Sequence, residues 1–192
     1  MTRIPEHLLH AFEPRRAWLS HDSYFHGIDH LTRVFILQEL ICTKLEEQGV
    51  KIDRTALRYA AIAHDVGRVN DDRDPDHGRH SATWMNEHLA QKMTPEELDT
   101  STYAVHWHAL PDKEAPVMTA ELSILKDADN LDRVRLGNFN PDYLRNSVSR
   151  SLISTAEELW RLSQSEDEDR SATYEEVVRA ASTLGLIADR AS

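Results

Sequence analysis

The chain has 192 residues and a formal net charge of −11, from 22 Lys plus Arg against 33 Asp plus Glu. This length suits one well-buried core rather than two. A chain this acidic lacks the basic footprint that a nucleic-acid backbone requires, so nucleic acid is not an expected partner. A small anionic substrate stays compatible with the charge, because a bound metal ion can dominate the local field.

The cysteine content and the N-terminal sequence bear on the compartment. Cys42 is the single cysteine, which excludes an intrachain disulfide and a cysteine-based zinc site. The N-terminal sequence MTRIPEHLLHAFEPRR lacks the apolar run of a signal peptide, and no stretch approaches the roughly 18 apolar residues of a membrane span. We therefore expect a cytoplasmic protein without a membrane partner.

The spacing of apolar residues is helical along most of the chain, and strand-like alternation is scarce. We expect helices over residues 5–19 (broken near Pro14), 27–48, 54–66, 79–92, 94–108, 119–135, 144–164 and 172–188. Loops are expected over 67–77, 110–117 and 137–143, which are rich in turn-forming residues.

Local signals support several of these helix ends. Gly49 is expected to end the long helix over 27–48, and Asp53 has the side chain of an N-cap for the next one. Thr94, with Glu97 three residues later, forms a capping-box sequence. The pattern predicts an all-α fold in one domain over 1–192, with C-terminal helices over 144–188.

Three of the predicted helices each direct a metal-binding type of side chain towards the core. His64 shares a helix face with Leu57, Ala60 and Ala61, and the adjacent Asp65 is costly to bury unless it is paired or bound to a metal. His30 shares a face with Val34, Leu37 and Ile41, and Asp129 lies near the apolar side of its helix. A single inward histidine is usually a core residue, so the order and context of the whole set must support a metal site.

That order resembles the HD superfamily of metal-dependent phosphohydrolases, which implies a helical HD-domain bundle with a core over about residues 20–140. The resemblance rests on five segments: HGIDHLTRV at 26–34, AAIAHDVGR at 60–68, DPDHGRHSA at 74–82, YAVHWH at 103–108 and ILKDADNLDRVR at 124–135. Together they are specific for the fold and its metal site, and much less so for a substrate.

The resemblance implies a set of metal ligands. His30, His64, Asp65 and Asp129 match the primary ligands, with Asp65 as the bridge if two ions bind. His77 and His108 match the histidines of a second site, with His80 and His106 as competitors for these roles. The implied cofactor is one or two divalent ions, Mn²⁺, Fe²⁺, Co²⁺, Ni²⁺, Zn²⁺ or Mg²⁺. Asp127 and Asp132, which flank Asp129, are expected to support a ligand or to cap a helix.

The implied activity is hydrolysis of a nucleotide or another small phosphate ester, as a phosphomonoesterase or a phosphodiesterase, by metal-activated water. Asp65 would orient that water, and Arg68 or Arg79 would hold phosphate oxygens. Asp71, Asp72 or Asp74 would act as general acid or base. The roles of the arginines and of the loop aspartates each compete with an ordinary one, in a surface ion pair or an Asp-rich turn.

Two other functions stay open at this stage. Proteins similar to this family hold a mixed-valence di-iron centre on the same ligand order and oxidise C–H bonds, and His77 and His108 are compatible with that chemistry. A metal-stabilised binding module without catalysis is the third reading. The helices after residue 144 lie outside the matching segments, and they are open to three roles: covering the site, completing the core or forming a homodimer face.

Overall fold

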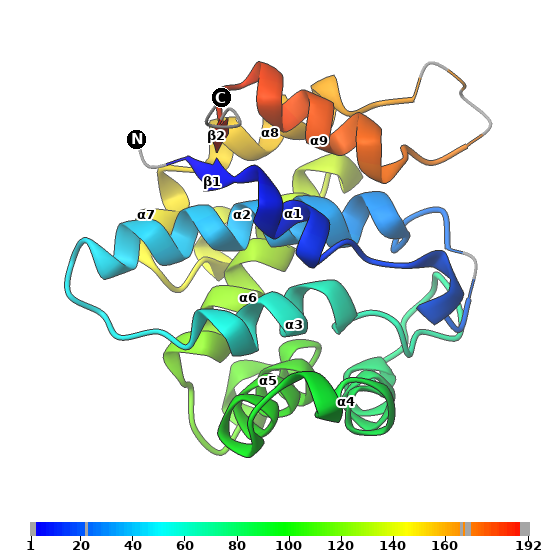
Figure 1. The fold of residues 1–192 in the computed structure, drawn as a ribbon, viewed down its shortest axis with the longest axis vertical. Coiled ribbons are helices and arrows are strands. Elements are labelled where there is room, and N and C mark those ends of the chain that lie inside the picture. The colour runs from blue at the N-terminus through cyan, green and yellow to red at the C-terminus, as the bar shows by residue number, and fades with distance from the viewer. Residues whose placement is uncertain (1–2, 22, 166, 168–169, 189–192) are drawn as a thin grey trace.

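The computed structural model describes residues 3–21, 23–165, 167 and 170–188, and most of these residues are helical. Figure 1 shows the helices stacked in layers along the longest axis of the molecule. The prediction of an all-α fold is confirmed. The expectation of one domain over 1–192 stays a prediction, and residues 1–2, 22, 166, 168–169 and 189–192 lie outside the described part.

The α-helices are α1 (Glu6–Ala11), α2 (Ile28–Glu46), α3 (Arg54–Ala63), α4 (His77–His88), α5 (Pro95–His108), α6 (Ala120–Asp132), α7 (Ser147–Arg150), α8 (Ile153–Leu162) and α9 (Tyr174–Thr183). Short 3₁₀ turns are η1 (Arg16–Trp18), η2 (Ala90–Lys92), η3 (Asp112–Glu114), η4 (Arg133–Leu136) and η5 (Pro141–Tyr143). Within the described residues, no helix is both long enough and apolar enough to cross a membrane.

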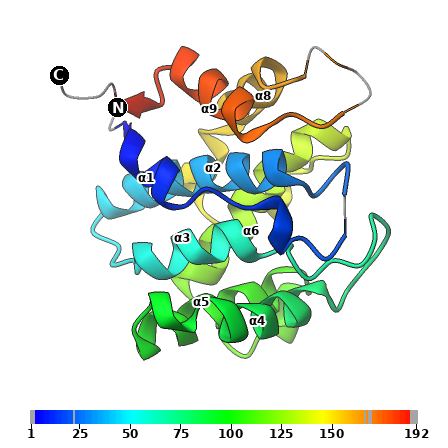
Figure 2. The ribbon, with the colours of Figure 1, turned by 45° about the vertical axis from the view of Figure 1, so that its right-hand side comes forward.

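Helix α2 runs through the middle of the molecule (Figures 1 and 2). It packs against α3 and α6 on one side and against α7, α8 and α9 on the other. As a result even polar residues of α2 are buried, including Arg33, Gln38 and Glu39. The face of Val34, Leu37 and Ile41 is buried as expected from the sequence, but the buried surface of α2 is much wider than that face.

The predicted helix over 54–66 ends three residues early, because a contact with another helix redirects the chain. After α3 the residues form a tight turn, in which the backbone N–H of Gly67 donates to Ser81 Oγ of α4. A Cβ at Gly67 would lie 2.5 Å from the backbone nitrogen of Ser81. Only a glycine allows this approach, and it holds the exit of α3 against α4.

The predicted helix over 144–164 starts late and is broken into two helices, and a buried carboxylate from α6 explains the late start. Asp127 accepts hydrogen bonds from the backbone N–H groups of Arg145 and Asn146 and from Ser149 Oγ. These bonds hold the chain just before α7, which begins only at Ser147, and a turn at residues 151–152 separates α7 from α8.

Two further predictions differ from the structure at the ends of helices. Helix α4 starts at His77, two residues before the expected start, so His77 belongs to the helix rather than to the preceding loop. The expected helix over 172–188 ends at Thr183 and continues into β2 (Ile187–Ala188). This strand pairs in parallel with β1 (Ile4–Pro5), joining the two ends of the described chain.

Candidate metal centre

The residues of the candidate site come from five separate helices, whose relevant ends meet on one side of the molecule. The N-terminal end of α2 and the C-terminal end of α3 lie side by side (Figures 1 and 2). α2 carries His30, the turn after α3 carries His64 and Asp65, and α6 carries Asp129. The first residue of α4 is His77 and the last residue of α5 is His108.

The first cluster joins the four residues that were predicted as primary ligands. His30 Nε2 lies 3.1 Å from His64 Nε2 and 3.5 Å from both Asp65 Oδ2 and Asp129 Oδ1. His64 Nε2 lies 3.8 Å from Asp65 Oδ2 and 4.0 Å from Asp129 Oδ1. Both histidines are fully buried and Asp65 is nearly so, while the Asp129 side chain is 32% exposed, so the first cluster reaches from the core to the solvent.

The second cluster lies on the other oxygen of the same aspartate. His77 Nε2 lies 3.0 Å and His108 Nε2 lies 3.6 Å from Asp65 Oδ1. The two Nε2 atoms are 3.1 Å apart. The two oxygens of Asp65 therefore face different histidine pairs, which is the arrangement of a carboxylate that bridges two ions.

The hydrogen bonds of the histidines determine where their protons lie. The Nδ1 atoms of His64, His77 and His108 face the backbone carbonyl oxygens of Ala61, Asp74 and Val105. A carbonyl oxygen only accepts, so each Nδ1 carries the proton and a neutral ring leaves its Nε2 lone pair free. Without protons, the Nε2 atoms of His77 and His108 cannot hydrogen-bond to one another at 3.1 Å, but they can share a cation.

The Nε2–Nε2 separation within each histidine pair fits a first-row metal ion. Two atoms that are each about 2.1 Å from one ion are about 3.0 to 3.4 Å apart at octahedral or tetrahedral angles. The pair His30–His64 and the pair His77–His108, both at 3.1 Å, lie in this range. Imidazole nitrogen together with carboxylate oxygen is a donor set for Mn²⁺, Fe²⁺, Co²⁺, Ni²⁺ or Zn²⁺.

The electrostatic environment of the clusters also favours a cation. Burial lowers the pKa of His64 to about 3, so its ring is neutral at pH 7. Burial acts in the same direction on His30, but hydrogen bonds with Asp132 and Asp65 outweigh it and raise the pKa of His30 to about 8. Burial raises the pKa of Asp65, yet His64 and the neighbouring imidazoles hold it well below its usual range. Asp65 and Asp129 therefore stay ionised, and at pH 7 His30 carries a proton that an ion at the first cluster would displace.

A cavity of about 830 Å³ opens onto the clusters and holds some of the predicted catalytic residues. Arg68 lines it and is buried, with Nη1 3.2 Å from His77 Nδ1 and Nη2 donating to the backbone oxygen of Asp72. The exposed Asp72 lines the same cavity. Asp71 and Asp74, also in its wall, bind Ser23 and the backbone N–H of Val69 respectively.

The structure does not bring Arg79 to the clusters. Its side chain is 55% exposed on α4, where it contacts Asp76 and His80. His80 therefore lies beside Arg79 rather than beside Asp65. His106 neighbours Trp107, and burial followed by the charge of Arg79 lowers its pKa. Of the competing histidines, His77 and His108 are the two that meet Asp65.

Sequence reasoning missed His26. Its Nδ1 lies 2.9 Å from Asp65 Oδ2, and its side chain borders the cavity. Burial lowers its pKa, with Asp65 opposing the shift. The signal in the sequence is its spacing of four residues from His30, but His26 precedes α2 and no helical face could be assigned to it. Asp132 was expected near the site, and it accepts a hydrogen bond from His30 Nδ1 at 2.7 Å.

Comparison with known proteins agrees with this geometry. A family model described as "HD domain" matches residues 27–134, which is more than half of the chain. No curated protein and no solved structure matches the chain. The matched segment runs from the start of α2 to just beyond α6 and contains His30, His64, Asp65, His77, His108 and Asp129. The chain is therefore a member of the HD-domain family, whose members are generally metal-dependent phosphohydrolases.

Proposed function

We propose that this protein is a phosphohydrolase that uses two divalent metal ions and acts on a small phosphate ester, with a nucleotide as the leading candidate. His30, His64, Asp65 and Asp129 would hold one ion, and His77, His108 and Asp65 would hold the other. The observation that carries this proposal is the pair of Nε2–Nε2 contacts at 3.1 Å on opposite oxygens of Asp65.

The chemistry follows from the charge of a phosphate ester, which repels an attacking nucleophile. Bound divalent ions lower the pKa of water and neutralise charge on the phosphoryl oxygens. Asp65 would orient the attacking water, because its two oxygens lie between the histidine pairs. His26 lines the cavity, and because its Nδ1 lies 2.9 Å from a carboxylate oxygen of Asp65, the proton of its neutral ring is on Nδ1. Its other nitrogen, Nε2, would therefore be the one that accepts a proton.

Two cationic side chains in the cavity wall are placed to bind the phosphoryl group. The Arg68 guanidinium borders the second cluster, and its buried Nε has no hydrogen-bond partner among the described residues. Lys126 lies one turn before Asp129 on α6, and its Nζ donates to the Leu110 carbonyl and to Asp112. An ammonium group has three protons, so one more is left to donate into the cavity.

The size and lining of the cavity support a substrate of nucleotide dimensions. Its volume of about 830 Å³ falls within the range of small-molecule sites. Beyond the clusters its wall includes Tyr143, which is 66% exposed, and also Arg133 and Arg145. An aromatic ring and guanidinium groups in the wall of one cavity suit a planar, anionic substrate.

The test is hydrolysis of an aryl phosphate monoester, an aryl phosphate diester and a nucleotide panel. Each is assayed with Mn²⁺, Co²⁺, Ni²⁺ or Mg²⁺ added to metal-stripped protein. We expect turnover that depends on the added ion, and the two aryl esters distinguish a monoesterase from a diesterase. Absence of turnover with every ion, in protein shown to be metal-loaded, would overturn the proposal.

The alternative of a di-iron oxygenase uses the same six side chains, and the bridging position of Asp65 is compatible with it. Anaerobic purification followed by iron quantification separates the two functions. Less than one iron per chain, with hydrolysis restored by Mn²⁺, excludes the oxygenase. Two irons per chain and no hydrolysis would favour it.

A further inference from the structure

A buried ionic cluster of Asp132, Arg33 and Arg135 lies beside the first cluster, on the Nδ1 side of His30. Asp132, at the end of α6, is 1% exposed and accepts hydrogen bonds from three side chains. His30 Nδ1 lies 2.7 Å and Arg135 Nε 2.8 Å from its Oδ2, and Arg33 Nε lies 2.6 Å from its Oδ1. Each oxygen of this carboxylate is therefore held from a fixed direction.

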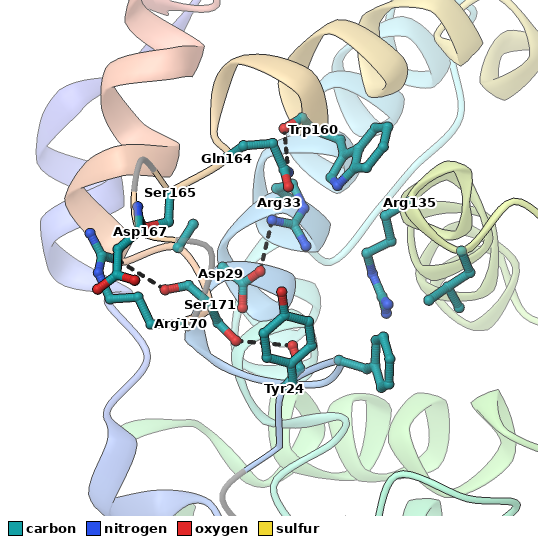
Figure 3. A pocket seen from close by; sticks show the side chains of 13 residues that line it. Tyr24, Asp29, Arg33, Arg135, Trp160, Gln164, Ser165, Asp167, Arg170 and Ser171 are labelled. Atoms are coloured by element: carbon teal, nitrogen blue, oxygen red, sulfur yellow. Dashed lines mark hydrogen bonds and ion pairs between the residues drawn. The ribbon is translucent and has the colours of Figure 1, made fainter.

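The two arginines that bind Asp132 are themselves fixed. Arg33 lies within α2, is 1% exposed and donates from Nη1 to Asp29 Oδ2 at 2.9 Å. Arg135 reaches Asp132 from η4, the 3₁₀ turn after α6. Figure 3 shows Arg33, Arg135 and Tyr24 on the wall of a separate cavity of about 420 Å³, with the Arg33–Asp29 contact drawn as a dashed line. Two guanidinium groups with a single carboxylate between them leave Asp132 little freedom to rotate.

His30 differs from the other three histidines in how its ring is oriented. His64, His77 and His108 each direct Nδ1 to a backbone carbonyl three residues earlier, so their own turns set the ring. For His30 the carbonyl in that position belongs to Gly27, which accepts the backbone N–H of Leu31. The partner of His30 Nδ1 is instead a side chain 102 residues away, on another helix.

From this contrast we infer that Asp132 is a positioning residue, which orients His30 and keeps its proton on Nδ1 so that Nε2 faces the ion of the first cluster. Arg33 and Arg135 hold Asp132 in place for this role. The inference rests on the metal centre of the proposed function, but it does not depend on which substrate is hydrolysed.

The arrangement has a chemical and a mechanical effect. A carboxylate that accepts a hydrogen bond from Nδ1–H makes the imidazole a stronger ligand, as is common for metal-binding histidines. It also ties α2 to α6, so that α6 both supplies the ligand Asp129 and orients the ligand His30. Loss of this contact should weaken the first ion while leaving His77 and His108 intact.

The experiment compares Asp132→Asn with Asp127→Asn in the full chain. Asp127 is a matched control, because it is a fully buried carboxylate on the same helix whose partners are Arg145, Asn146 and Ser149. Calorimetric titration of metal-stripped protein with Co²⁺ gives the affinity of each ion, and the visible spectrum of Co²⁺ reports its ligands. Thermal unfolding of the metal-free proteins measures the loss of stability separately.

We expect Asp132→Asn to weaken one of the two Co²⁺ sites by about 10- to 100-fold and to alter its spectrum. Asp127→Asn should lower the unfolding temperature but leave both affinities and the spectrum unchanged. If Asp132→Asn fails to fold, Arg135→Gln provides the second variant. It loosens one oxygen of Asp132 and should weaken the same site by a smaller factor.

Other results would overturn the inference. Wild-type affinity and spectrum in a folded Asp132→Asn or Arg135→Gln protein would show that His30 needs no support from Asp132. Equal loss of affinity in the Asp127→Asn control would show a general effect of stability. Wild-type protein that binds Co²⁺ without hydrolysing any ester contradicts the proposed function alone, whereas wild-type protein that binds no Co²⁺ contradicts both.

Discussion

His77 Nε2 and His108 Nε2 lie 3.1 Å apart, although the two residues belong to different helices. Gly78 explains how they meet, because a Cβ at this position would lie 2.7 Å from the carbonyl oxygens of Val105 and His106. The first turn of α4 can therefore rest directly on the last turn of α5. Each ring carries its proton on Nδ1, so the two Nε2 atoms do not hydrogen-bond to each other and are placed to bind a second ion.

Replacing His77 by Ala should remove one of two bound ions. The second cluster would keep only His108 and one oxygen of Asp65, which is too few ligands for tight binding. His80→Ala is the matched control, because His80 lies on the same helix but contacts Arg79. Metal analysis after dialysis should give about one ion per chain for the first variant and two for the second. Equal metal content in both variants would contradict the second site.

Gly78→Ala should destabilise the protein and disturb the second cluster. The added methyl group would clash with backbone atoms of α5, which overpacks the contact and costs about 1 to 3 kcal/mol. Gly49→Ala serves as the comparison, since Gly49 has φ of +84° and open space around its Cβ position. Urea unfolding should show both variants destabilised, but only Gly78→Ala should lose metal.

Asp65→Asn should abolish activity more completely than any other single change in the site. Asp65 contacts both histidine pairs, so the substitution weakens both ions and removes the group that orients water. We expect turnover to fall by more than about 100-fold, which is the upper range for residues that merely support a ligand. Asp76→Asn, with its side chain 63% exposed on the N-terminal side of α4, should keep wild-type turnover.

Removal of metal should lower the unfolding temperature of the protein. An ion that binds only the folded state stabilises it by about 2.7 kcal/mol at 100 times its dissociation constant. For a chain of this length that corresponds to a shift of about 5 to 10 °C. Differential scanning calorimetry with Mn²⁺, and then with excess chelator, measures the shift. An unchanged transition at saturating Mn²⁺ would argue against a site that forms on folding.

A pH effect is expected at α9, far from the metal centre. A hydrogen bond from Arg170, followed by one from the backbone N–H of Thr173, lowers the pKa of Glu176 to about 2. A lowered carboxylate pKa contributes stability that is present above pH 4.5 and is lost as the pH falls towards 2. The difference in unfolding free energy between wild type and Glu176→Gln should therefore shrink over this interval.

Features with local causes could be predicted from the sequence. The capping box of Thr94 and Glu97 and the N-cap of Asp53 are both present, because each needs only neighbouring residues. The start of α7 only after residue 146 could not be predicted, since it depends on Asp127, which is distant in the sequence. The early end of α3 likewise depends on Ser81 across the fold.

The candidate site likewise has residues that the sequence could group and residues that it could not. His30, His64, Asp65 and Asp129 could be grouped from helical faces and motif order, and the structure brings them together. The choice of His77 over His80 could not be made, because residues three apart share a helix face and the contact of Gly78 with α5 decides between them. His26 lies before α2, where no periodicity applies.

The burial of α2 on all sides has a consequence for how this protein can be divided. The family match ends at residue 134, but α2 continues its packing onto α7, α8 and α9. A fragment cut to the matched segment would keep every proposed ligand and yet expose the flank of α2 that these helices cover. We expect such a fragment to aggregate, so the unit that folds is longer than the unit that carries the chemistry.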